Sequence, residues 1–146
     1  HKTADGQHYQ LLGNLENPFW AVDSRDYQVV QPDLKKFKLL GAKIITLEQI
    51  LDHVEYERAI MAIRFSDEMV GIQFHPEVDP ISFLNHLKKP EVKDKVIATK
   101  GKMKFRAMIE HLVDDDRILK TNETLIPDFL ENSIRRVKEC QQLSVI

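Results

Sequence analysis

Two apolar runs joined by three polar residues constrain the fold of this chain more than any other feature. The runs are Ala59–Phe65 and Met69–Phe74, with Ser66-Asp67-Glu68 between them. So short a polar connection is typical of a hairpin, although the usual turn glycine is absent. The second run is nearly all apolar apart from Gln73, as expected of a strand covered on both faces. Gly71 inside it predicts close approach by another backbone.

Weaker strand and helix signals lie on either side of this hairpin. Three short runs before it are strand candidates: Phe19–Val22, Tyr27–Val30 and Phe37–Leu40. After residue 80 the pattern predicts a short helix, an amphipathic helix over Met103–Val113, and a final helix with Pro127 in its first turn. The predicted buried stripe of the final helix is Phe129, Leu130, Ile134, Val137 and Cys140.

The order of these signals predicts the organisation of the chain. Strands followed by helices indicate an α/β body over residues 1–80 and a helical segment over residues 81–146 that packs on the same domain. A length of 146 residues with 42% hydrophobic content suits one domain.

Charge and composition set expectations about partners and compartment. A net charge of -2 gives no electrostatic reason to expect nucleic acid or an anionic membrane as a partner, and the lysines of residues 93–104 are predicted to form a solvated face. No apolar run approaches the length of about 20 residues that spans a bilayer. A single cysteine, Cys140, and a polar beginning without a signal sequence favour the cytoplasm.

The residues that follow the second apolar run carry the most chemistry. His75 and Glu77 stand two apart, with Pro76 between them to stiffen the turn. Histidine is suited to move protons near neutral pH, and a carboxylate that binds one ring nitrogen fixes the tautomer. A solvated pair at a strand exit is the alternative. A metal site made with Asp79 is disfavoured, because ligands in an extended segment point to alternating sides.

The stretch Gly71-Ile72-Gln73-Phe74-His75-Pro76-Glu77 resembles the His-Pro-Glu signature of class I, triad-type glutamine amidotransferases. The segment Phe19–Val30 resembles the family stretch that reads Ser-His-x-Asp followed by apolar residues, with Arg25 in place of the histidine. The resemblance covers residues 11–80. It implies part of an open, mostly parallel, flavodoxin-like sheet with flanking helices, followed here by a helical C-terminal extension.

The resemblance also implies roles for individual residues. His75 would be the general base for a cysteine thiol and Glu77 would orient it, so that glutamine is hydrolysed to glutamate and ammonia through a thioester. Ser24, Arg25 and Asp26 would help hold the glutamine. The family chemistry requires no cofactor and no metal.

The nucleophile of such a triad is missing from this sequence. No segment upstream of the motif resembles the family's G-x-C-x-G turn, and Cys140 lies on a helix without glycine or a strained turn. We therefore expect a fragment, or a partner chain that supplies the missing half. The 146-residue chain alone should show no glutaminase activity.

Other functions remain open at this stage. They are a non-catalytic amidotransferase-like interaction module and a related triad acyltransferase. The ammonia acceptor is not identified by the sequence, because it would belong to a synthase domain or subunit. Guanylate synthesis and a stand-alone amidotransferase-like protein are both compatible with the resemblance.

Overall fold

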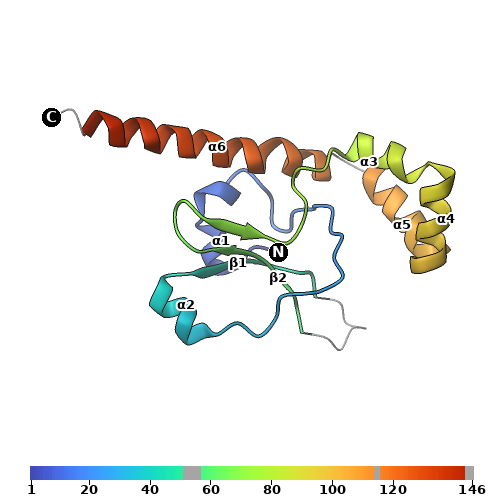
Figure 1. Ribbon diagram of the computed structural model, residues 1–146, viewed down its shortest axis with the longest axis horizontal. Coiled ribbons are helices and arrows are strands. Elements are labelled where there is room, and N and C mark those ends of the chain that lie inside the picture. Colours follow the sequence, from blue (N-terminus) through green and yellow to red (C-terminus); the bar gives the residue numbers. More distant parts are fainter. Residues whose placement is uncertain (51–56, 114–115, 144–146) are drawn as a thin grey trace.

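The computed structural model of the chain describes residues 1–50, 57–113 and 116–143. A small antiparallel sheet lies below one long helix, and three further helices form a lobe at one end (Figure 1). In chain order the elements are α1 (Ala4–Gln7), the 3₁₀ turn η1 (Gln10–Leu12), α2 (Leu34–Leu40), β1 (Lys43–Leu47), β2 (Ile60–Arg64), β3 (Val70–Ile72), α3 (Pro80–Leu87), α4 (Pro90–Lys100), α5 (Lys102–Val113) and α6 (Arg117–Leu143).

The sheet has the order β1-β2-β3, and both pairs of strands are antiparallel. In the β2–β3 hairpin Ala62 lies opposite Ile72 and Arg64 lies opposite Val70. The predicted open, mostly parallel, flavodoxin-like sheet is therefore wrong for the described part of the chain. The apolar run that suggested a strand covered on both faces is instead an edge strand, with Val70, Gly71 and Ile72 all half-buried.

The hairpin itself is confirmed, and side chains explain how its turn forms without glycine. Phe65 and Ser66 both donate from their backbone N–H groups to the Met69 carbonyl, at 2.9 and 3.2 Å. The Ser66 hydroxyl donates to Glu68 at 2.9 Å, and Arg64 pairs with Asp67. The neighbour of Gly71 is the Phe65 ring, which a Cβ on Gly71 would approach to 3.0 Å, and not the backbone that the sequence predicted.

The earlier strand predictions fare less well. Residues 19–22 and 27–30 form no strand, although Val22 makes an isolated antiparallel bridge to His75. The run Phe37–Leu40 belongs to the helix α2. That helix begins where the Asp33 carboxylate accepts from the Lys36 N–H, and it ends at Gly41 in the left-handed conformation with φ 69°.

The core lies between the sheet, the N-terminal segment and α6. Its buried residues are Leu11, Leu12, Leu15, Ile45, Ala62, Phe74 and Leu125. Close packing of α1 on β1 requires glycine at position 6, because a Cβ there would lie 1.9 Å from the Ile45 carbonyl oxygen.

The helices after residue 80 confirm part of the prediction and correct the rest. The helices α3 and α5 match the predicted ones closely. The last helix begins at Arg117, so Pro127 lies inside it and not in its first turn. The first turns of α6 bury Ile118, Thr121 and Leu125 against the body.

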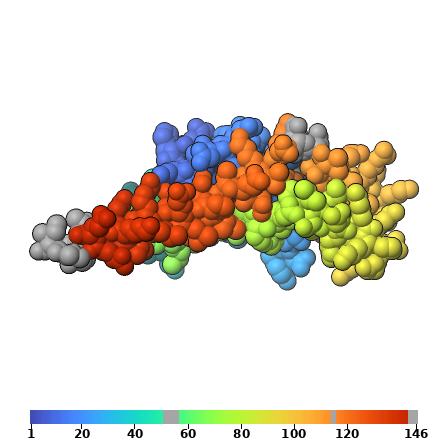
Figure 2. Space-filling model, turned by 90° about the horizontal axis from the view of Figure 1, so that it is seen from above, coloured from blue at the N-terminus to red at the C-terminus, as the bar shows by residue number. Residues whose placement is uncertain are grey.

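The predicted buried stripe of α6 is wrong beyond Phe129. That residue packs against the core, whereas Leu130, Ile134 and Val137 are 53%, 56% and 57% exposed and Cys140 is exposed as well. Leu130, Ile134 and Val137 do not share the line of Phe129 along the helix, which reaches the body again at Arg136 through Asp67 and Glu68. The last turns of α6 extend past the end of the body (Figures 1 and 2).

Candidate active site

The backbone around His75 is held by three hydrogen bonds from different parts of the chain. The His75 N–H donates to the Val22 carbonyl at 2.8 Å, which joins the end of the hairpin to residues 19–22. The Val78 N–H closes the turn on the His75 carbonyl at 3.4 Å. The Asn122 side chain of α6 donates to the Pro76 carbonyl at 3.0 Å. The imidazole is therefore carried by a well-anchored segment.

Both ring nitrogens of His75 face acceptors. Nδ1 lies 2.8 Å from Glu77 Oε1, and Nε2 lies 3.4 Å from the Ser24 carbonyl oxygen. The His75 side chain is 39% exposed and that of Glu77 is 58% exposed, so solvent reaches the pair. The pair that the sequence predicted is thus formed, with the carboxylate on one nitrogen and the other nitrogen directed at the Ser24 loop.

These contacts favour the charged forms of both side chains. The hydrogen bond to Glu77 is the main cause that raises the pKa of His75, and the Ser24 carbonyl and the charges of Glu77 and Asp23 act in the same direction against partial burial. The pKa of Glu77 is lowered, first by its own backbone N–H and then by the hydrogen bond to His75. Both shifts widen the pH range over which an imidazolium stands beside a carboxylate.

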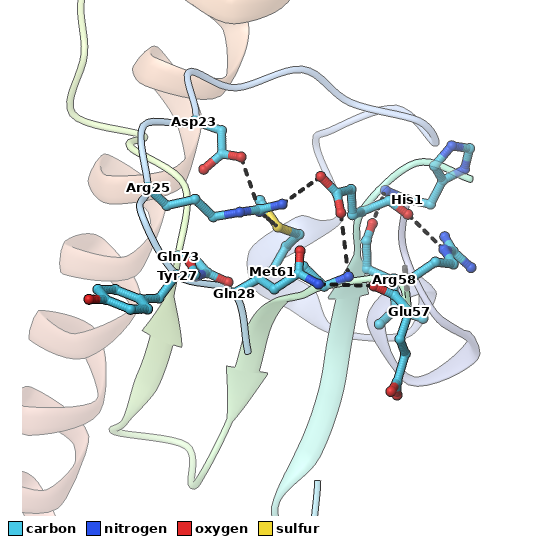
Figure 3. Close-up of polar contacts among 12 residues, drawn as sticks. His1, Asp23, Arg25, Tyr27, Gln28, Glu57, Arg58, Met61 and Gln73 are labelled. Atoms are coloured by element: carbon cyan, nitrogen blue, oxygen red, sulfur yellow. Dashed lines mark hydrogen bonds and ion pairs between the residues drawn. The ribbon is translucent and has the colours of Figure 1, made fainter. Parts of the chain in front are cut away.

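Arg25 is bound by the protein itself (Figure 3). Its guanidinium lies 3.0 Å from Asp23 and 2.5 Å from Glu48, and it also contacts the Met61 sulfur at 2.8 Å. The arginine side chain is only 16% exposed. Because its donors already face two carboxylates of the chain, Arg25 braces the loop of residues 23–26 against β2 and the segment after β1.

Asp23 lies between this brace and the histidine. Burial raises its pKa, the charge of Arg25 lowers it, and that of Glu48 raises it again; the charges of His75 and Lys104 also lower it. The loop is thereby electrostatically connected to both the imidazole and the beginning of α5.

The other two predicted loop residues differ in their relation to the site. Ser24 meets His75 through its backbone carbonyl, while Asp26 is exposed. Gln73 lies directly after β3 and two residues before His75. Its side chain donates to the Tyr27 carbonyl at 2.9 Å and leaves its buried Oε1 without a hydrogen-bond partner among the described residues.

Cys140 lies far from this site. It is 18 residues beyond Asn122 on α6, and a helical rise of 1.5 Å per residue separates the two by about 27 Å. Because Asn122 contacts the turn next to His75, the thiol of Cys140 cannot reach the imidazole in this structure.

The described residues contain neither a metal-binding cluster nor a helix that could span a membrane. Within residues 1–50, 57–113 and 116–143, no group of three or more His, Cys, Asp or Glu side chains is arranged to hold a metal ion. No helix in the same ranges has the length and apolar character needed to cross a membrane. Comparisons with protein-family models, with curated proteins and with solved structures found no match.

Sequence reasoning missed several residues that build the site. Glu48 and Met61, which bind Arg25, and Asn122, which binds the turn, are distant in sequence and carry no motif. Val22 lay in the run Phe19–Val22 that was predicted to be extended, but nothing in the sequence indicated its bridge to His75.

Proposed function

We propose that His75 and Glu77 are the base and the orienting acid of a glutamine amidotransferase, and that the cysteine comes from a polypeptide segment outside these 146 residues. The observation that carries this proposal is the 2.8 Å contact between His75 Nδ1 and Glu77 Oε1, which leaves Nε2 on the opposite side of the ring. This is the arrangement of a base and its orienting group.

The raised pKa of His75 suits a cysteine partner. A thiol that transfers its proton to Nε2 becomes a thiolate beside an imidazolium, and the groups around His75 stabilise that imidazolium. The thiolate attacks the side-chain amide carbon of glutamine, and the imidazolium returns the proton to the nitrogen as the C–N bond breaks. Water activated by His75 then hydrolyses the thioester to glutamate.

The contact with Ser24 has a defined role in this cycle. A carbonyl oxygen accepts a hydrogen bond only from protonated Nε2, so the contact stabilises the charged ring. When Nε2 loses its proton, the two lone pairs repel and Nε2 becomes available to a thiol. Ser24 therefore stabilises the imidazolium that forms when the thiol has transferred its proton to His75.

The test compares two polypeptides in an assay of ammonia release from glutamine. The 146-residue chain alone is expected to be inactive, whereas the product of the longer coding sequence that contains it should release ammonia and be alkylated on cysteine by an electrophilic glutamine analogue. In the longer product, His75→Ala should reduce turnover at least about 100-fold. Glu77→Gln should reduce turnover as well, but by less than His75→Ala does.

Two results would contradict the proposal. One is a longer product whose ammonia release is unchanged by His75→Ala. The other is release by the 146-residue chain that His75→Ala abolishes, because the nucleophile would then lie within the chain. A folded His75→Ala protein, verified by circular dichroism, is needed for either comparison.

A non-catalytic interaction module is the second candidate, and one observation favours it. Both nitrogens of His75 are engaged by the chain, so the ring can serve as a cross-link between the Ser24 loop and the strand end. In that case His75→Ala lowers thermal stability and the longer product releases no ammonia.

A further inference from the structure

The helices α3, α4 and α5 form a lobe that stands beside the sheet, and their main packing is with one another (Figure 1). Neither α4 nor α5 has a fully buried residue. In the space-filling view the lobe occupies one end of the molecule, opposite the free end of α6 (Figure 2). Its surface is therefore largely open to a partner.

This lobe carries a charge opposite to that of the rest of the chain. Residues 80–113 contain eight Lys and Arg against three Asp and Glu, a formal net charge of +5. Because the whole chain has a net charge of -2, the remaining residues carry -7. The net charge of -2, which gave no reason to expect a polyanionic partner, is the sum of the charges of two oppositely charged parts.

The positive charge is densest where α4 meets α5. Lys100, Lys102 and Lys104 flank Gly101 and are all exposed, and we call these three lysines the basic corner. None of them forms an ion pair within 4.0 Å with another described residue, whereas the nearby Arg106 is paired with Glu110 at 3.1 Å. The three lysines of the basic corner therefore form no ion pair within the described residues, although the charge of Lys104 acts on Asp23 from a longer distance.

An exposed methionine lies inside this cluster and indicates the kind of partner. The Met103 side chain is 88% exposed between Lys102 and Lys104. An apolar side chain gains nothing beside the phosphates of a nucleic acid, and the two phenylalanines of the lobe, Phe83 and Phe105, are half-buried and so present no open stacking platform. Lysines around an apolar tip match the headgroup region of an anionic bilayer.

We propose that the basic corner and Met103 dock the protein reversibly on an anionic lipid surface. The lysines interact with the headgroups from above, and Met103 enters the interface between them. Three lysines and one methionine make a weak contact, since each cation near such a surface contributes about fivefold in binding. This proposal does not depend on the function of His75.

The experiment measures sedimentation of the 146-residue chain with vesicles of phosphatidylcholine containing about 40% phosphatidylglycerol, whose negative surface attracts basic segments. Binding is expected at low salt, with loss in 0.5 M salt because the Debye length falls to a few ångströms, about 3 Å at 1 M. Vesicles of phosphatidylcholine alone should not bind. The triple variant Lys100→Gln, Lys102→Gln, Lys104→Gln should bind about 100-fold more weakly.

A matched control removes the same charge from another exposed helix. Lys35, Lys36 and Lys38 lie on α2, away from the lobe and beside the exposed Leu34 and Leu39, so α2 is the competing basic and apolar surface (Figure 1). If the basic corner is the docking site, replacement of these three lysines by Gln leaves vesicle binding unchanged within twofold. Met103→Ser should weaken binding without changing its salt dependence. Equal losses from both triple variants, or retention of duplex DNA with no binding to vesicles, would overturn the proposal.

Discussion

His75 is held by groups that stabilise its charged ring, so its titration is the most direct test of the site. In NMR titrations its pKa should lie above the ordinary value of 6.5, because Glu77 and the Ser24 carbonyl both accept from the protonated imidazole. Glu77→Gln should lower this pKa. A His75 pKa that is insensitive to Glu77→Gln would contradict the pair.

The raised pKa of His75 also predicts that the free energy of unfolding depends on pH. Because the pKa of His75 is raised on folding, its contribution to the free energy of unfolding is complete below pH 6.5 and is lost as the pH rises through the folded value. Urea unfolding of the wild-type chain and His75→Gln should therefore differ more at pH 5.5 than at pH 9. A difference that grows with pH would have the wrong sign.

Arg25 is expected to act as a positioning residue for the loop beside His75. Arg25→Met leaves Asp23 and Glu48, which are about two-thirds buried, without their shared cation. The expected loss of stability is about 1–3 kcal/mol by urea unfolding. The pKa of His75 should also fall, because the Ser24 carbonyl is no longer held against Nε2.

A matched variant separates this effect from the loss of any surface arginine. Arg106 forms an ion pair with Glu110 on α5 and is 83% exposed. Arg106→Met should change stability by less than about 0.5 kcal/mol and leave His75 unaffected. If both variants behave alike, Arg25 does not brace the loop.

Sequence reasoning at the residue scale worked where partners are neighbours and failed where folding brings them together. His75 and Glu77 are two residues apart at a strand exit, so their contact follows from local geometry. Arg25 was predicted to help hold the glutamine, but Asp23, Glu48 and Met61 surround it, and the last two approach only through the tertiary fold.

At the scale of elements, α6 has one buried end and one exposed end. Leu125→Ala should destabilise the chain by about 2–5 kcal/mol, because the side chain is 2% exposed within the core. Leu130→Ala removes the same atoms from a position that is 53% exposed and should cost well under about 1 kcal/mol. Thermal or urea unfolding of the two variants measures the difference; similar losses would mean that the exposed half of α6 is covered in solution.

The elements that were predicted correctly are those with strong local signals. The hairpin, α3 and α5 have clear apolar periods and ends. For α2, Asp33 and Gly41 were available as cap signals, but the apolar run Phe37–Leu40 was given strand character and the caps were overlooked. The start of α6 was displaced because Pro127 is a common first-turn residue, while tertiary packing extends the helix ten residues before it.

At the scale of the whole molecule, the parallel sheet was predicted from the family resemblance, whereas the hydrogen bonds between the strands form an antiparallel sheet. The described strands pair only with neighbours of opposite direction. Apolar composition cannot separate a central parallel strand from a half-buried antiparallel edge, because both bury part of each face. The short connection at residues 66–68 explains the antiparallel direction of the β2–β3 pair, but not that of β1 and β2, which residues 48–59 join.

The unequal burial of the two parts of the molecule predicts unequal protection. Ile45, Ala59 and Ala62 of the sheet region are at most 3% exposed, whereas α4 and α5 bury no residue fully. Amide hydrogens of α4 and α5 should therefore exchange faster than those of β1 and β2 in a native-state hydrogen-exchange experiment. Exchange of both regions at one common rate would show that lobe and sheet unfold as a single unit.

The separation of +5 on the lobe from -7 on the remaining chain also makes the protein an electric dipole. A charged surface orients such a protein before the two come into contact, to a degree that depends on ionic strength. The lobe faces a negatively charged surface, and the sheet and α6 face a positively charged one. Orientation on approach is thus a property of the folded chain, present before any specific contact is made.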